Sequence, residues 1–283
     1  MRWLKVFVLG MAALLLLAML GVYFYLRAIG IVPRAIYETE PPVLPDFGAP
    51  AILVLTKANG FVHEAAIPAA DAAFAAIAEE QGWELFITDN AASHNSEDLK
   101  KFKLVIWNNV SGDVLTADQR QALKGWIESG GGWLGVHGAG GDFSYDWDWY
   151  VEALIGTQFI GHPMDPQFQS ADVLVAEPEN TITAHIPSPW RIDNEEWYAF
   201  ATNPRELGYE ILLTIDESSY VTRGETMLMD DNMDGEHPLA WRHQLGQGRV
   251  LYSAIGHQAA TYEMPVYRRF LAEAMRWALD KSP

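Results

Sequence analysis

The chain has 283 residues, and 49% of them are hydrophobic, which suffices for one large domain or two small ones. The first 34 residues carry four basic and no acidic side chains, so the remainder holds 37 acidic against 15 basic residues, a net charge of −22. This charge disfavours nucleic acid and anionic lipid as partners. The absence of cysteine excludes disulfides, thiolate metal sites and a cysteine nucleophile.

An apolar segment lies close to the N-terminus. Residues 6–26 carry no charge and follow the basic residues Arg2 and Lys5. A helix needs about twenty such residues to cross a bilayer, so we predict a signal-anchor transmembrane segment within residues 1–34. A cleaved signal peptide is the alternative, although its apolar region is usually shorter, roughly 7 to 15 residues.

The flanks of this segment bear on topology. Arg27 and Arg34 balance the basic residues that precede the segment, so the positive-inside signal is weak. We expect a single-pass membrane protein whose acidic soluble domain is periplasmic or extracellular. Residues 35–50 are rich in proline and lack periodicity, which predicts an extended tether between the membrane segment and the domain.

Beyond the tether, β-rich runs alternate with helical patterns. The early part of this region predicts strands over 51–57, 83–89, 103–110 and 132–138, with helices over 67–82 and 116–130 between them. The later part predicts strands over 171–177, 210–218, 238–245 and 249–257, a hairpin turn at 246–248 and a last helix over 266–279. We therefore expect one α/β domain over residues 51–281. Its sheet would be doubly wound and mostly parallel, in a flavodoxin-like three-layer sandwich with an inserted β-rich section.

Histidines follow several of these strands. His137 ends a strand in "GGGWLGVHGAGG", and glycines in such numbers mark tight turns or a surface that another group approaches closely. His63 and His257 also come just after predicted strands, and His162 lies in "TQFIGHP". The carboxyl ends of parallel strands meet at one edge, so His63, His137 and His257 are predicted to converge there as metal ligands or as acid and base. Each histidine taken singly is also compatible with a structural role.

Carboxylates and aromatic rings accompany the histidines. Glu195 and Glu196 are adjacent, so at most one of them is expected in a given pocket, and a solvated loop position is favoured for Glu195. Asp142 closes the glycine run as a second carboxylate candidate or as a helix cap. Aromatic rings suit the apolar faces of sugars, and they can equally pack a helix onto the sheet. The candidates near these carboxylates are Trp147, Trp197 and Tyr198.

Four motifs together resemble the ThuA-like (trehalose-utilisation) family, whose fold is similar to that of class I glutamine amidotransferases without their cysteine. They are "GGGWLGVHGAGG", Phe159 to Pro163, Glu195 to Tyr198, and "HPLAWRHQLGQGRVLYSAIGHQ" near the C-terminus. The chain departs from the family pattern at Val62, where arginine is common, and at Glu195, where the family has aspartate.

The resemblance implies a role with carbohydrates, in particular oxidised (keto) disaccharides or glycosides. The matching site positions are His63, His137, His162, Glu196 and His257. We expect His137, Glu196 and His162 to be catalytic, with Glu196 or His137 as base in proton transfer next to a sugar carbonyl. The residues expected to bind substrate are Asp142, Trp147, Trp197 and Tyr198, and those expected to bind a divalent metal such as zinc are His63, His137, His162 and His257.

Two functions from different classes remain open at this point. One is a membrane-anchored sugar-processing enzyme, a lyase, isomerase or hydrolase. The other is a non-catalytic carbohydrate-binding module tethered to the membrane. No nucleotide cofactor is expected, because the chain has neither a phosphate-binding loop nor a dinucleotide fingerprint.

Overall fold

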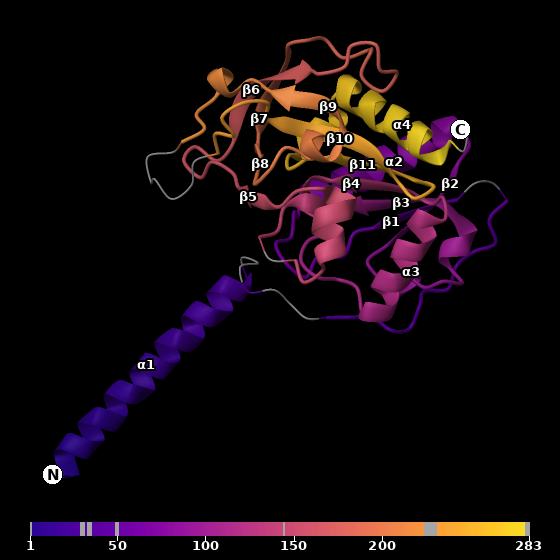
Figure 1. Ribbon diagram of the computed structural model, residues 1–283. Helices are drawn as coiled ribbons and strands as arrows, with labels where there is room; N and C mark the ends of the chain where they lie inside the picture. Colours follow the sequence, from indigo (N-terminus) through magenta and orange to yellow (C-terminus); the bar gives the residue numbers. More distant parts are fainter. Residues whose placement is uncertain are drawn as a thin grey trace.

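The computed structural model describes residues 2–28, 32, 36–48, 51–143, 145–223 and 231–280. Helix α1 (Arg2–Ala28) stands apart from the rest of the chain (Figure 1). Its residues 5–27 have a mean hydropathy of 2.5 and are not buried by the protein. The helix is long and apolar enough to span a membrane, and a signal sequence has the same character.

The domain is built on a nine-stranded sheet in the order β2-β1-β3-β4-β11-β10-β9-β6-β7. The first five of these strands run parallel to one another, namely β1 (Ala51–Leu55), β2 (Glu84–Thr88), β3 (Phe102–Asn108), β4 (Gly132–Val136) and β11 (Gly248–Ser253). The other four continue the sheet in antiparallel fashion, namely β6 (Gln169–Val175), β7 (Trp190–Glu195), β9 (Glu210–Ile215) and β10 (Pro238–Leu245).

Both faces of the parallel part are covered by helices, as doubly wound topology requires. Helix α2 (Ala66–Gln81) contacts α4 (Pro265–Leu279), while α3 (Ala117–Glu128) lies on the other face (Figure 1). The predicted α/β class is confirmed. All five residues of β1 are fully buried because helices cover the strand on both sides, which explains its uninterrupted apolar run.

Local sequence signals account for the element ends. Helix α3 begins with a capping box between Thr116 and Gln119. Helix α2 ends at Gly82, whose φ of 69° is left-handed. The hairpin turn predicted at 246–248 joins β10 to β11, and in the structure only residues 246 and 247 form it, because Leu245 pairs with Gly248.

The β-rich insertion contains secondary-structure elements that the sequence patterns did not predict. It includes a π-helical turn (Tyr150–Ile155) and a small second sheet of β5 (Phe159–Gly161) and β8 (Ala199–Phe200). Strand β7 ends at Glu195, and the preceding Asn194 has a φ of 55°. This backbone turn interrupts the strand's alternation just before the two glutamates.

The stretch expected to be a tether, residues 35–50, is described over 36–48 and is bound to the domain. Leu44 and Phe47 pack against its core, and the Phe47 and Phe102 rings lie 5.3 Å apart. The backbone amide of Gly48 donates to Glu84 at 2.9 Å. We call residues 36–48 the strap. The folded unit therefore includes the strap as well as residues from 51 onward, and residue 281, the expected end of the domain, lies outside the described residues.

Candidate functional site

The site forms where loops leave the carboxyl edge of the sheet. His63 follows β1, His137 follows β4 and His257 follows β11, and all three strands are parallel. Glu196 follows the end of β7, which runs in the same direction as β11 because four antiparallel pairings separate the two strands. The chain order of the strands reverses between β1 and β3, the switch point at which such folds bind ligands.

The four side chains meet at contact distance. His137 Nε2 lies 3.2 Å from His257 Nδ1 and 3.4 Å from Glu196 Oε2, and the last two atoms are 3.0 Å apart. The His63 ring lies 4.8 Å from the rings of both His137 and His257. The convergence of His63, His137 and His257 expected from their positions after parallel strands is thus present in the structure.

His137 occupies an elbow between β4 and a short 3₁₀-helix (His137–Gly140), with a φ of 45°. Its Nδ1–H donates to the carbonyl of Ala254 at 2.7 Å, because a carbonyl can only accept. In the neutral ring, Nε2 therefore carries the lone pair; in the protonated ring, Nε2–H can donate to Glu196 Oε2, 3.4 Å away. The backbone carbonyl of His137 accepts from the Tyr252 hydroxyl at 2.7 Å, which fixes the elbow from the other side.

The glycines after His137 make room for two tyrosine rings. A Cβ at Gly140 would lie 2.5 Å from the Tyr252 ring, and a Cβ at Gly141 would lie 2.5 Å from the Tyr198 ring. Tyr198 stacks on His137 with ring centroids 4.2 Å apart, and its hydroxyl lies 2.9 Å from His137 Nε2. Close approach is therefore the reason for this glycine cluster.

The adjacent glutamates have opposite electrostatic environments. Burial alone would raise the pKa of Glu196, but hydrogen bonds to His137 and His257 outweigh it and hold that pKa well below its usual range. Burial raises the pKa of Glu195, against the lowering effects of His137 and a hydrogen bond from Thr261. Glu196 is therefore ionised at neutral pH.

Glu195 is fully buried, which corrects the expectation of a solvated loop position. Its carboxylate accepts from the Thr261 hydroxyl at 2.5 Å and from the His257 backbone amide at 3.0 Å. Both glutamates thus hold His257, one by its backbone and one by its ring. The turn at Asn194 and the end of β7 allow this, because strand alternation no longer separates the two side chains.

The His63 side chain is buried, and its Nδ1 has no hydrogen-bond partner among the described residues. Burial lowers the pKa of its imidazole well below the usual value, and the neighbouring His137 and His257 lower it further. A neutral imidazole with an unpaired nitrogen is suited to binding a cation, and an unpaired buried nitrogen is otherwise costly.

The four residues His63, His137, Glu196 and His257 can hold a metal ion, since one ligand atom from each lies within 4.8 Å of all the others. Three of the separations, 3.0, 3.2 and 3.4 Å, suit zinc, because tetrahedral bonds of about 2.0 to 2.1 Å place ligand atoms about 3.3 Å apart. Three imidazoles and a carboxylate form a donor set of the kind that zinc uses. Glu196 takes the place in this set that the sequence had suggested for His162.

His162 lies next to the cluster, on the other oxygen of Glu196. Its Nδ1 is 3.4 Å from Glu196 Oε1 and 3.0 Å from the Pro163 carbonyl, and the side chain is 20% exposed. Gln167 donates to the same Glu196 oxygen at 2.6 Å. His162 and His257 are half-buried, whereas His63, His137 and Glu196 are buried.

The residues expected to bind substrate are distributed differently. Tyr198 lies on the cluster, but Trp197 is fully buried and its indole donates to the Gln169 carbonyl at 3.1 Å. Trp147 packs on Tyr150, with its ring centroid 5.6 Å from the Arg120 guanidinium, and the structure gives it no contact with the histidines. Trp147 and Trp197 therefore belong to the packing of the fold in this structure.

Asp142 lies on the site side of the domain, half-buried beside the loop after β1. A Cβ built at Gly60 would lie 3.1 Å from its carboxylate, and its backbone carbonyl accepts from Gln158 at 2.6 Å. The sequence reasoning missed Gln167, Tyr252 and Thr261, which hold the cluster through single hydrogen bonds. No local sequence pattern could have identified these three residues, because they lie in separate segments of the chain that meet only in the folded domain.

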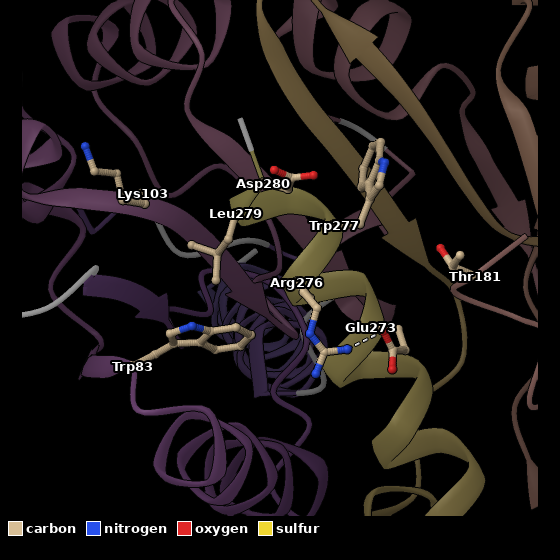
Figure 2. Close-up of a pocket in the computed structure, with 8 residues that line it drawn as sticks. All are labelled: Trp83, Lys103, Thr181, Glu273, Arg276, Trp277, Leu279 and Asp280. Carbon is tan, nitrogen blue, oxygen red and sulfur yellow. Dashed lines mark hydrogen bonds and ion pairs between the residues drawn. The ribbon is translucent and has the colours of Figure 1, made fainter. Parts of the chain in front are cut away.

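A cavity of about 650 Å³ lies at the opposite edge of the sheet (Figure 2). Its walls come from the residues before β2, the start of β3 and the end of α4, and Arg276 pairs there with Glu273. Its described lining includes no histidine. This cavity therefore lacks the convergent ionisable groups of the histidine cluster.

The fold and the site define a doubly wound α/β protein with a buried centre of three imidazoles and one carboxylate. The chain belongs to the ThuA family, described as trehalose utilisation, whose model matches residues 51–278. Its domain is thus related to carbohydrate utilisation at the level of the family.

Solved structures agree with this assignment. A ThuA-like protein from Bacteroides uniformis is 26% identical with a TM-score of 0.68, covering 84% of this chain and 95% of that one. A ThuA-like protein from Parabacteroides merdae is 14% identical with a TM-score of 0.61, covering 82% and 90%. A β-galactosidase from Rahnella shares the fold alone, at 16% identity and a TM-score of 0.50, covering 82% of this chain and 32% of that one. No curated protein matches the chain.

Proposed function

We propose that the protein is a membrane-anchored, metal-dependent enzyme that acts on oxidised (keto) disaccharides or glycosides. The observation that carries this proposal is the convergence of His137, His257 and Glu196 at 3.0 to 3.4 Å, with the unpaired nitrogen of His63 beside them. Zinc is the proposed metal, held by His63, His137, Glu196 and His257. The family supports carbohydrate as the substrate class.

A divalent cation in this donor set would supply Lewis-acid polarisation of a substrate oxygen. His162 is the imidazole left outside the set, and its Nδ1–H donates to the Pro163 carbonyl, so Nε2 is its basic nitrogen. In the proposed reaction His162 Nε2 takes the proton from the carbon next to the sugar carbonyl. The C–H electron pair becomes a carbon–carbon double bond, and the carbonyl electrons move to its oxygen.

Neighbouring side chains position these groups. Gln167 holds Glu196 from the side away from His257, and Glu195 holds the His257 backbone. With His137 Nε2 serving as a metal ligand, the Tyr198 hydroxyl 2.9 Å away would not donate to that nitrogen. Its proton is then available to a substrate oxygen, the role proposed for this residue. Asp142 is proposed to accept from a sugar hydroxyl at the rim.

The anchoring is part of the same proposal. Helix α1 has the length and hydropathy of a membrane span. We place the enzyme as a single-pass membrane protein with its domain in the periplasm or outside the cell. Its partners are then a small carbohydrate and the membrane, with no role for nucleic acid.

The test is elemental analysis of the full chain in detergent, produced without a histidine tag and purified without chelators. We expect about one zinc per chain, as the single donor set requires. The H137A variant should lose the metal, while the H185A control should keep it, because His185 is half-buried and bonds only the Val266 carbonyl among the described residues. Thermal unfolding of both variants would show that the fold is intact.

A metal-free protein would contradict the metal-dependent form of the proposal. Glu196 with His137 would then be the remaining acid–base pair, and turnover of keto-glycosides by the wild type but not by H137A would support it. Glycoside binding without turnover, unchanged in H137A and H162A, would instead indicate a carbohydrate-binding module.

A further inference from the structure

The strap begins at the same edge of the sheet as the histidine cluster. The Ile36 carbonyl accepts from Asn59 Nδ2 at 3.0 Å, and the same amide group donates to the Asp113 carbonyl at 2.7 Å. Asn59 lies in the loop that carries His63, and Asp113 lies in the loop after β3. The start of the strap is therefore held by two loops that leave the carboxyl edge.

Further contacts hold the next residues at this edge. Glu38 pairs with Lys57, its carboxylate accepts from the Ala91 amide at 3.3 Å, and its backbone carbonyl accepts from Gln119 at 2.7 Å. The strap then crosses to the other edge, where Gly48 meets Glu84 at the start of β2. The strap therefore runs from the carboxyl edge to the opposite edge of the sheet, and its end nearer to α1 lies on the same side as the histidine cluster.

The connection to α1 is short. Seven residues lie between Ala28, the last residue of α1, and Ile36, and the eight Cα–Cα steps that join these two residues span at most about 29 Å. A domain of this size is about 45 Å across. A connection that starts at the carboxyl edge cannot easily pass around the domain, so this edge faces the bilayer when α1 spans it. Figure 1 shows α1 on the β5 side of the domain, away from the end of α4.

The same edge carries exposed apolar side chains around the histidines, which we call the apolar rim. Its members are Phe61, Val62, Phe143, Ile160, Met164 and Phe168, with exposures from 36% to 57%. The rings of Phe61 and Phe168 lie 6.2 and 4.9 Å from the His257 ring. Ile160 and Met164 flank His162 in the chain, and Phe143 packs on Phe159 at 4.8 Å.

We propose that the apolar rim rests in the surface of the bilayer that holds α1, so that the mouth of the histidine site opens at the membrane interface. The proposal rests on the membrane anchoring proposed above and is independent of the metal and the reaction. Exposed aromatic and aliphatic side chains grouped in this way mark an interaction surface, and beside a membrane anchor the nearest apolar phase is the lipid. Because the domain is acidic overall, the contact is apolar and suits a zwitterionic surface.

The absence of native cysteine permits a direct test on the full chain. The M164C variant places a thiol on the rim, and the L207C control places one at an equally exposed apolar position, 57% against 55%. Leu207 lies just before β9, which starts at the opposite edge. Each thiol receives an environment-sensitive fluorophore, and the labelled chain is reconstituted into phosphatidylcholine vesicles with or without a lipid that bears a nitroxide near the head group.

We expect the nitroxide lipid to reduce the emission of labelled M164C about twofold, as for a group buried about 5 to 10 Å into the interface, and to leave labelled L207C nearly unchanged. Equal and weak quenching at both positions would overturn the proposal. Energy transfer between labelled copies, without lipid quenching of M164C, would also overturn it and assign the rim to a second copy.

Intact mass of the reconstituted chain separates this inference from the proposed function. A mature chain that lacks α1 would overturn the bilayer contact, whereas its metal content would still test the enzyme proposal. A chain that retains α1 and shows rim quenching but holds no metal would support the contact and contradict the metal-dependent reaction.

Discussion

At the scale of single residues, the cluster depends on side chains that have room to approach one another. His137 adopts a left-handed φ, and the two following ring contacts, from Tyr252 and Tyr198, require the absence of a side chain at Gly140 and Gly141. The sequence showed that the glycines were unusual. Only the structure shows that they admit tyrosine rings rather than a ligand.

The variant G141A tests this interpretation. Its added methyl group would lie 2.5 Å from the Tyr198 ring and must displace the ring from His137. We expect metal affinity to fall about tenfold or more, as it does when a supporting contact of a ligand is lost. The measurement is a metal titration of the apo-protein.

The matched control for this variant is G125A. Gly125 lies within α3, and an added Cβ would meet nothing within 4 Å. This change should leave metal affinity unaltered and stabilise the helix by up to about 1 kcal/mol. Wild-type metal affinity in G141A would contradict the role given to Tyr198.

At the scale of elements, the strap shows how a segment without regular structure becomes part of a fold. Its prolines and lack of periodicity indicated a free tether, yet Glu38, Phe47 and Gly48 are bound to three different elements. These contacts join residues 19 to 55 positions apart in the chain, for example Glu38 to Lys57 and Phe47 to Phe102. Local sequence patterns do not report such distant partners.

Two substitutions within the strap test its docking. F47A removes a ring that packs on Phe102, so we expect the free energy of unfolding to fall by about 2 kcal/mol, less than for a fully buried phenylalanine. V43A truncates a side chain that is 95% exposed and should change stability by less than about 0.5 kcal/mol. Urea unfolding of the full chain in detergent measures both, and equal stabilities would show that the strap is not docked in solution.

At the scale of the whole molecule, buried neutral histidines link stability to pH. His94 is fully buried and accepts from the Trp107 indole at 3.0 Å, and burial lowers the pKa of its imidazole to about 3. In the unfolded chain this pKa is about 6.5. Between these values the unfolded state binds the extra proton, so the stability that is complete above about pH 6.5 is lost as the pH falls.

We therefore expect the free energy of unfolding to decrease by about 1.4 kcal/mol per pH unit from His94 alone within this window. The H94Q variant keeps an acceptor for Trp107 but cannot titrate, so its stability should depend less steeply on pH. Denaturant unfolding of the full chain at several pH values between about 6.5 and 4 compares the two slopes. Identical slopes would contradict the assignment of the acid response to His94.

The sequence by itself determined the α/β class, the apolar N-terminal helix, the helix caps, the β10–β11 hairpin and the family. These features depend on local sequence patterns. A buried strand is a continuous apolar run, a capping box marks the start of a helix, and a glycine marks its end. The position of His63, His137 and His257 just after predicted parallel strands also predicted that they would converge, because parallel strands share an edge.

Only the tertiary structure decided which groups touch. It placed Glu196 among the three histidines, assigned Glu195 and Trp197 to interior packing and bound the strap along the domain. It also continued the parallel strands with four antiparallel ones, which bring Glu196 to the site. The physical reason is the same in each case. Contact between residues distant in the chain depends on how elements pack, and the sequence pattern of any one element does not contain that information.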